Sequence, residues 1–192
     1  MDYYLEIRPL LDFISCGDIG IVKEFDNKVF VALVDVLGHG KKAYEVALSS
    51  KEFFEENYRE EDLIKIIKSF HQQIKGSRGA VVGIFIIDLK TGYLKCSGIG
   101  NISLKIFGAN PVNVLFRPGI VGYSMSEPKL FSVSLNDGDV IVMHSDGVKE
   151  HFNLKEYPDI LKDDAKTIVK NIMQRFGKNH DDASCIALRY KK

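Results

Sequence analysis

Apolar and polar residues fall into short blocks along the chain, and a block near the N-terminus is the most informative. Residues 30–36 are aliphatic, aromatic or β-branched apart from Asp35, which is typical of a buried strand. Gly38 and Gly40 follow directly, and a helical pattern begins at Lys41. The pattern predicts a strand, a tight loop and a helix. A carboxylate beside an apolar strand needs a hydrogen-bond donor, a cation or a metal, so Asp35 requires a partner from elsewhere in the chain.

A second apolar run, residues 19–25, precedes this strand, and only Asp26-Asn27 separates the two runs. Two turn residues between apolar runs predict a β-hairpin. In the register of a two-residue turn, Asp18 lies directly opposite Asp35. Facing carboxylates destabilise a sheet, so this register calls for a cation between them. A longer turn would shift the register and separate the two side chains.

The remaining pattern predicts an α+β fold. The helical segments cover about residues 43–58, 60–75 and 165–176, and the strand-like segments cover 3–8, 80–89, 93–97, 103–107, 112–116, 130–135, 140–144 and 184–190. The segment around residues 118–122 is predicted to be loop, and residues 136–139 are predicted to join their two flanking strands as a hairpin. Hairpins with helices in separate blocks favour sheets that pack together under a cover of helices.

Length and composition predict one domain over residues 1–192, with enough apolar residues to bury a sizeable core. The 26 basic residues balance 26 acidic ones, so no overall field attracts nucleic acid or an anionic membrane. The longest apolar run, residues 80–87, is far shorter than the roughly 20 residues of a membrane span. We therefore expect a soluble, cytoplasmic protein. The three cysteines are widely spaced and are expected to be core thiols, although Cys16 lies close enough to Asp18 to be reactive.

Four aspartates occur where apolar strands meet glycine or turn residues: Asp18, Asp35, Asp146 and Asp181. Two lie at the ends of strands and two just before strands begin, and such ends lie together in antiparallel sheets. Oxygen-only ligands suit Mg²⁺ or Mn²⁺, and a pair of such ions activates water and binds phosphoryl oxygens. The alternative is that each aspartate caps backbone amides in its own turn.

Two histidines lie near these carboxylates. His39 follows Asp35 in the glycine loop, where it would either protonate a leaving group or cap or contact the following helix. His144 alternates with Asp146 and is expected to pack beside the site rather than bind metal.

The motifs occur in an ordered series. They are Gly17-Asp18, then Asp35-Val36-Leu37-Gly38-His39-Gly40, then Ser145-Asp146-Gly147-Val148-Lys149-Glu150, and last Asp181-Asp182-Ala183-Ser184. The series resembles the type 2C metal-dependent (PPM) serine/threonine phosphatases, and within them the bacterial SpoIIE-like branch. Residues 97–101 and 119–122 resemble the middle blocks of that family, so the likeness covers nearly the whole chain.

This resemblance implies a four-layer αββα sandwich and a centre of two Mn²⁺ or Mg²⁺ ions. By motif position, Asp35 bridges both ions, Asp18 holds one, and Asp146 and Asp181 hold the other. The family commonly has glycine after the first aspartate, where the backbone carbonyl is a ligand directly or through water. Val36 stands at this position, and the resemblance implies that its carbonyl takes this role.

The resemblance does not fully determine two assignments, the last metal ligand and the phosphate-binding arginine. Asp182 neighbours Asp181, so the assignment to Asp181 rests on the spacing Asp-x-x-Ser. The phosphate-binding arginine of the larger eukaryotic relatives has no secure counterpart, because Arg8 matches it only loosely.

The implied function is a protein phosphatase in which metal-held hydroxide attacks phosphoserine or phosphothreonine in line. In its small size the chain resembles the feedback phosphatases of the bacterial stressosome. This resemblance implies a phosphorylated regulatory partner with a STAS domain. One alternative is an inactive phosphatase-like module that binds phosphorylated partners. Another is a hydrolase of small phosphoesters or nucleotides, although no P-loop or dinucleotide glycine pattern supports it.

Overall fold

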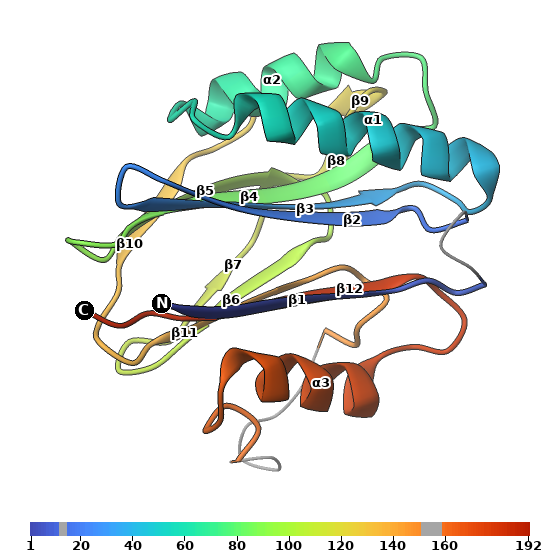
Figure 1. The fold of residues 1–192 in the computed structure, drawn as a ribbon. Coiled ribbons are helices and arrows are strands. Elements are labelled where there is room, and N and C mark those ends of the chain that lie inside the picture. Colours follow the sequence, from blue (N-terminus) through green and yellow to red (C-terminus); the bar gives the residue numbers. More distant parts are fainter. Residues whose placement is uncertain (12–14, 151–158) are drawn as a thin grey trace.

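The computed structural model describes residues 1–11, 15–150 and 159–192, and these form four layers (Figure 1). Two five-stranded sheets pack face to face, two helices cover one sheet, and one helix covers the other. The predicted α+β fold with its αββα layers is confirmed. No helix in the described ranges is long and apolar enough to cross a membrane.

The first sheet has the strand order β1-β12-β11-β6-β7, and the second has the order β10-β5-β4-β3-β2. All neighbouring strands within them are antiparallel. The strands of the first sheet are β1 (Asp2–Arg8), β6 (Ser103–Phe107), β7 (Val112–Val114), β11 (Val140–His144) and β12 (Ala183–Arg189). Those of the second are β2 (Asp18–Phe25), β3 (Lys28–Val36), β4 (Ala80–Asp88), β5 (Tyr93–Ile99) and β10 (Phe131–Ser134). A small pair, β8 (Gly119–Ile120) and β9 (Ser124–Met125), lies in the region predicted to be loop.

The helices begin near the residues that their sequences indicate. Helix α1 (Lys41–Asn57) starts after Gly40, whose φ of 83° favours glycine. Helix α2 (Leu63–Gln73) and helix α3 (Ala165–Phe176) are capped by Asp62 and Asp164, whose carboxylates accept backbone N–H groups of their own first turns. The second helix therefore begins later than the pattern predicted, because Asp62 acts as its cap.

Three apolar clusters hold the layers together. Side chains from both sheets meet in the central cluster, which includes Leu33, Phe85 and Ile186. Helices α1 and α2 pack Phe54 and Phe70 onto the second sheet, while α3 packs its own apolar face onto the first. The three cysteines are all buried and free, and burial raises the pKa of Cys16 to about 12. They are core thiols, as predicted.

The first hairpin has the predicted register. Asp26 and Asn27 form its turn with φ angles of 45° and 61°, the left-handed conformation that a tight two-residue turn requires. Phe25 therefore pairs with Lys28, and Asp18 lies directly opposite Asp35. The hairpin brings two carboxylates to one end of the second sheet.

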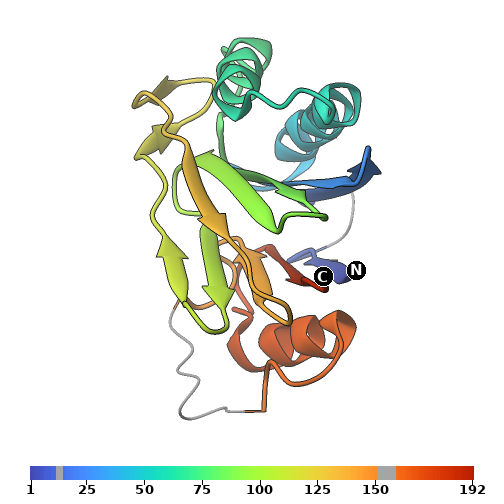
Figure 2. The same cartoon turned by 90° about the vertical axis from the view of Figure 1, so that its left-hand side faces the viewer.

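The predicted hairpin around residues 136–139 is wrong. Strand β10 pairs with β5 in the second sheet, whereas β11 pairs with β12 and β6 in the first. Figure 2 shows the chain passing from one sheet to the other at this turn. Leu135 is buried between the sheets, and the N–H of Gly138 donates to the carbonyl oxygen of Tyr190. These contacts fix the turn against β12, and the turn residues alone do not specify which sheet the next strand joins.

Candidate active site

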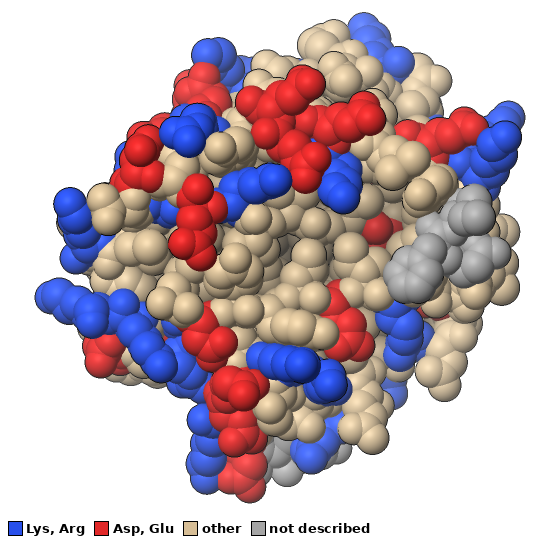
Figure 3. Space-filling view, viewed as in Figure 1, with Lys and Arg blue, Asp and Glu red and all other residues tan. Residues whose placement is uncertain are grey.

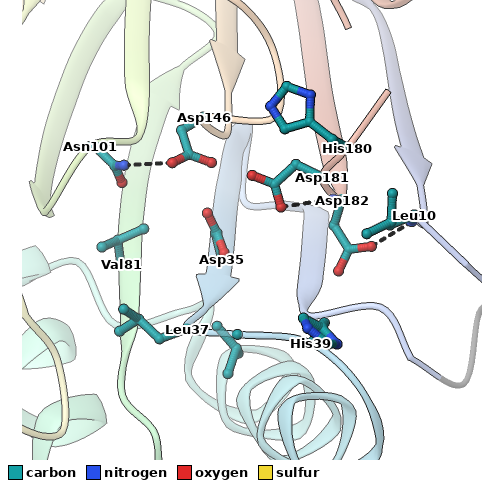
Figure 4. Close-up of a pocket in the computed structure, with 12 residues that line it drawn as sticks. Leu10, Asp35, Leu37, His39, Val81, Asn101, Asp146, His180, Asp181 and Asp182 are labelled. Carbon is teal, nitrogen blue, oxygen red and sulfur yellow. Dashed lines mark hydrogen bonds between the residues drawn. The ribbon is translucent and has the colours of Figure 1, made fainter. Parts of the chain in front are cut away.

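The four predicted aspartates meet at one end of the sandwich. The start of β2, the end of β3, the end of β11 and the start of β12 all lie there, so both sheets contribute. A cavity of about 230 Å³ opens at this end (Figure 4). It is lined by Leu10, Asp35, Val36, Leu37, Gly38, His39, Val81, Asn101, Asp146, His180, Asp181 and Asp182.

Three carboxylates point toward one another across this cavity: Asp35, Asp146 and Asp181 (Figure 4). Asp35 comes from the second sheet, and the other two come from the first. The side-chain amide of Asn101 donates to Asp146 Oδ2 at 3.0 Å and so orients that carboxylate. Juxtaposing the two sheets thus concentrates negative charge at the point where the strands end.

Asp18 lies deeper and does not line the cavity. It is 3% exposed, and its Oδ2 accepts a hydrogen bond of 2.7 Å from Ser145 Oγ. The same hydroxyl oxygen accepts the backbone N–H of Ser184 at 3.0 Å. Ser145 therefore links Asp18 of one sheet to the start of β12 in the other.

The charges on these groups are poorly compensated by the protein. Burial raises the pKa of Asp18 to about 7, and burial with the nearby charge of Asp18 raises the pKa of Asp35 to about 9. Burial and the charge of Asp146 also raise the pKa of Asp181. A cation between these side chains would favour their ionised forms.

The donor set fits a hard divalent cation. It consists of carboxylate oxygens with no cysteine or histidine among the predicted ligands, which suits Mg²⁺ or Mn²⁺ better than zinc. In the described part of the chain, no three His, Cys, Asp or Glu side chains stand close enough to enclose an ion. Binding would therefore require these carboxylates to move closer together.

The adjacent Asp181 and Asp182 have different surroundings. Asp182 Oδ1 accepts the backbone N–H of Leu10 at 2.6 Å, and Oδ2 accepts that of Gly17 at 2.8 Å. Both of its oxygens therefore brace the chain segment before β2. Among the described residues, Asp181 accepts a hydrogen bond from the N–H of Asp182 alone, and it points into the cavity (Figure 4). This geometry favours Asp181 over Asp182 as an open ligand.

The glycine loop forms the rim of the cavity beside Asp35. Its backbone is held by three hydrogen bonds: Val36 N–H to Gly17 O, Leu37 N–H to Gly79 O, and Gly40 N–H to Ser15 O. Val36 itself lines the cavity, as the ligand assignment for its carbonyl requires. His39 is exposed at the cavity rim, and within the described residues its ring makes no hydrogen bond. Helix α1 has no side-chain cap hydrogen bond, so the capping half of the alternative for His39 is wrong.

Packing explains why glycine follows Asp146. A Cβ at Gly147 would lie 1.8 Å from the carbonyl oxygen of Asp182 and 2.7 Å from the Cα of Ala183. Only glycine lets the two backbones that carry Asp146 and Asp181 approach this closely.

Two other residues raised by the sequence lie outside the cavity. His144 is 1% exposed, its Nδ1 is 2.9 Å from the carbonyl oxygen of Ser145, and burial lowers its pKa to about 4. It packs beneath the site, as predicted. Arg8 donates to the carbonyl oxygen of Lys178 and lies against Gly177. It holds the loop before β12 and does not line the cavity that contains the aspartates.

The sequence reasoning did not assign Asn101, His180 or the bracing role of Asp182. Asn101 belongs to residues 97–101, which resemble a middle block of the family. This resemblance pointed to the segment but did not assign a role to Asn101. The contacts of Asp182 join residues more than 160 positions apart, and no local pattern reveals them.

Comparison with known proteins decides the family. A family model described as Stage II sporulation protein E (SpoIIE) matches residues 26–191. The chain belongs to the SpoIIE family. This agrees with the branch that the motif order predicted. SpoIIE-like phosphatases are metal-dependent, which agrees with the all-oxygen site of this SpoIIE-family chain.

Individual relatives of this SpoIIE-family chain include a phosphatase and two solved structures. It is 30% identical over 137 residues to phosphoserine phosphatase RsbX of Bacillus subtilis (strain 168), covering 69% of this chain and 67% of RsbX. A structure from work on the bacterial stressosome as a modular system controlling secondary messenger signalling matches with a TM-score of 0.88 and 28% identity, over 97% of both chains. RsbX in complex with magnesium matches with a TM-score of 0.83 and 22% identity, over 97% of this chain and 94% of that chain, which supports the shared fold.

Proposed function

We propose that this SpoIIE-family chain is a metal-dependent protein phosphatase that acts on phosphoserine or phosphothreonine. The observation that carries the proposal is the convergence of Asp18, Asp35, Asp146 and Asp181 from both sheets on one end of the sandwich. Their uncompensated charge and all-oxygen chemistry suit divalent cations. The family membership and the likeness to phosphoserine phosphatase RsbX support the same chemistry.

Two ions, Mn²⁺ or Mg²⁺, would be held by these four carboxylates and the Val36 carbonyl. Asp35 is assigned to both ions by its motif position, and the charges of Asp18, Asp146 and Asp181 all act on its carboxyl. When bound, such ions supply an activated water and neutralise charge on the phosphoryl group. Asn101 fixes the orientation of Asp146, and Ser145 fixes that of Asp18.

His39 is assigned as the proton donor to the leaving serine or threonine oxygen. Its exposed ring lies at the rim of the cavity on the glycine loop that follows Asp35, and no described residue engages it. An imidazole in such a position can donate a proton to a substrate oxygen.

For the substrate, we propose a phosphorylated regulatory protein with a STAS domain, of the stressosome type, in the cytoplasm. The support is the likeness to RsbX and to the stressosome-related structure. Acidic and basic groups are interspersed on the face in Figure 3, in keeping with 26 residues of each sign. Recognition by local surface fit suits this distribution better than long-range steering. We propose that residues 1–192 act as one catalytic domain.

The alternative of an inactive module that binds phosphorylated partners is less well supported. Such a module has no need to bury Asp18 opposite Asp35, an arrangement that raises the pKa of both carboxyls. A site that binds cations offsets this cost each time it is filled.

The substrate assignment predicts a preference for the folded partner. Phosphorylated STAS protein and an unrelated phosphoserine peptide are offered at equal concentration with Mn²⁺, and phosphate release from each is followed. We expect the folded protein to be dephosphorylated at least about tenfold faster at low substrate concentration, since it adds a protein interface to the phosphoserine contacts. Equal rates would rule out the STAS assignment and leave the phosphatase proposal intact.

A further inference from the structure

Arg78 lies beside Gly38 of the glycine loop, on the turn that connects α2 to β4. A Cβ at Gly38 would lie 2.5 Å from Arg78 Nη1 and 3.7 Å from Arg78 Cζ, so the guanidinium occupies the space that a side chain at this position would fill. Gly38 itself lines the cavity and has a φ of 83°. The glycine loop therefore leaves room for a cationic group at the cavity rim.

The turn that carries Arg78 is fixed against the glycine loop. Gly79 O accepts the N–H of Leu37 at 3.0 Å, and Gly79 N–H donates to Ser77 Oγ at 3.1 Å. Gly79 has a φ of 82°, and a Cβ there would lie 2.4 Å from a side-chain carbon of Ile120. The backbone on either side of Arg78 is thus held by hydrogen bonds and close packing, and the side chain reaches Gly38, which lines the cavity.

In the described part of the chain, Arg78 makes no polar contact that accounts for this position. It is exposed, and within the described ranges its guanidinium makes neither an ion pair nor a hydrogen bond. Arg8, by contrast, is engaged by the carbonyl oxygen of Lys178 on another loop. Of these two arginines, only Arg78 lies beside Gly38, a residue that lines the cavity.

The charge balance of the site calls for such a group. The four proposed ligand carboxylates would neutralise two divalent ions, and Asp182 adds a further negative charge at the cavity wall. A phosphomonoester brings about two negative charges of its own at neutral pH. A guanidinium offers a planar fork of donors that matches two phosphate oxygens.

We propose that Arg78 binds the phosphoryl oxygens of the substrate at the cavity rim. The inference rests on the proposed phosphatase function and identifies a substrate-binding residue for it. Arg78 thereby takes the role for which Arg8 was the loose sequence match, from a different element of the fold. It also gives the glycine at position 38 a function, because a side chain there would displace the guanidinium.

Binding of inorganic phosphate to the full-length, Mg²⁺-saturated protein tests this proposal by calorimetry. We expect Arg78→Gln to weaken phosphate binding about ten- to hundredfold, as loss of hydrogen bonds to a charged group does. Arg78→Lys keeps the positive charge but loses the planar fork of donors, so its phosphate affinity should lie between those of the wild type and Arg78→Gln. Lys75→Gln removes a positive charge three residues away on the same exposed segment and should change the affinity less than about twofold.

Mg²⁺ affinity and the thermal midpoint of each variant separate ligand binding from a supporting role. We expect both quantities to stay at the wild-type values in Arg78→Gln. Equal phosphate affinities in Arg78→Gln and Lys75→Gln would overturn the proposal, as would no measurable phosphate binding by the wild type. Loss of Mg²⁺ affinity in parallel with phosphate would show that Arg78 only supports the loop. Arg78-dependent phosphate binding without any phosphatase turnover would refute the proposed function and leave this inference standing.

Discussion

Asp35→Asn is expected to reduce metal-dependent phosphatase turnover by at least about 10³-fold, because Asp35 is the carboxylate proposed to bind both ions. An asparagine retains the shape of the side chain but loses the charge that attracts the cations. The fold should persist, since the β2–β3 pairing depends on backbone hydrogen bonds and apolar neighbours.

The same variant should be more stable than the wild type when chelator is present. In the metal-free fold, burial and the charge of Asp18 raise the pKa of Asp35 from its ordinary value of 3.8 to about 9. Between these two pH values the unfolded chain ionises Asp35 more readily than the folded chain does. The wild type therefore loses stability as pH rises from about 4 to about 9, by at most about 1.4 kcal/mol per pH unit for this group. The stability advantage of Asp35→Asn should grow between pH 5 and pH 8.

Calorimetric titration with Mn²⁺ tests the role of Asp35 in metal binding, and thermal melts at several pH values test the stability of Asp35→Asn. Asp163→Asn serves as the control, because it removes an exposed carboxylate on the α3 side of the fold. Saturating Mn²⁺ should stabilise the wild type and the control more than Asp35→Asn. Wild-type Mn²⁺ affinity in Asp35→Asn would remove Asp35 from the metal site.

His39→Ala is expected to slow hydrolysis of a phosphoserine substrate by about 10²-fold, because an alkoxide leaving group needs a proton. The same change should hardly affect p-nitrophenyl phosphate, whose leaving group departs without protonation. The exposed ring at the cavity rim leads to this expectation.

The two substrates provide the control within one experiment, using kcat for each with the same Mn²⁺-loaded protein. A selective loss on phosphoserine supports proton donation by His39. An equal loss on both substrates would instead indicate that His39 shapes the glycine loop, and its assignment as proton donor would fail.

The β2–β3 hairpin was predictable because the residues that determine its register are adjacent in the sequence. The dipeptide Asp26-Asn27 adopts the left-handed conformation of a tight turn, and this turn fixes every pair along the ladder. The juxtaposition of Asp18 with Asp35 follows from that register alone. Likewise, the strand-end positions of Asp146 and Asp181 led to the expectation that all four carboxylates share one edge.

Other features depend on contacts that no local pattern contains. The turn at residues 136–139 crosses between sheets because Leu135 enters the central cluster and Gly138 bonds to Tyr190. The contacts of Asp182 with Leu10 and Gly17 also join distant parts of the chain. Such features become visible only when the two sheets are packed.

The layered fold explains how these distant motifs form one site. Each sheet alone brings two of the aspartates near its end, and packing the sheets face to face places the pairs together. Gly147 permits the close approach of the chain after β11 to the start of β12. The chemistry therefore depends on the sandwich as a whole, while the helices stabilise its outer faces.

The most direct test of this account is phosphate release from a phosphoserine protein by the wild-type chain, measured with Mn²⁺, with Mg²⁺ and with excess chelator. We predict turnover with at least one of the two ions, and loss of that turnover in chelator with recovery when the ion is restored. Equal phosphate release in chelator would contradict a metal-dependent site. No release under any of the three conditions would contradict the phosphatase assignment itself.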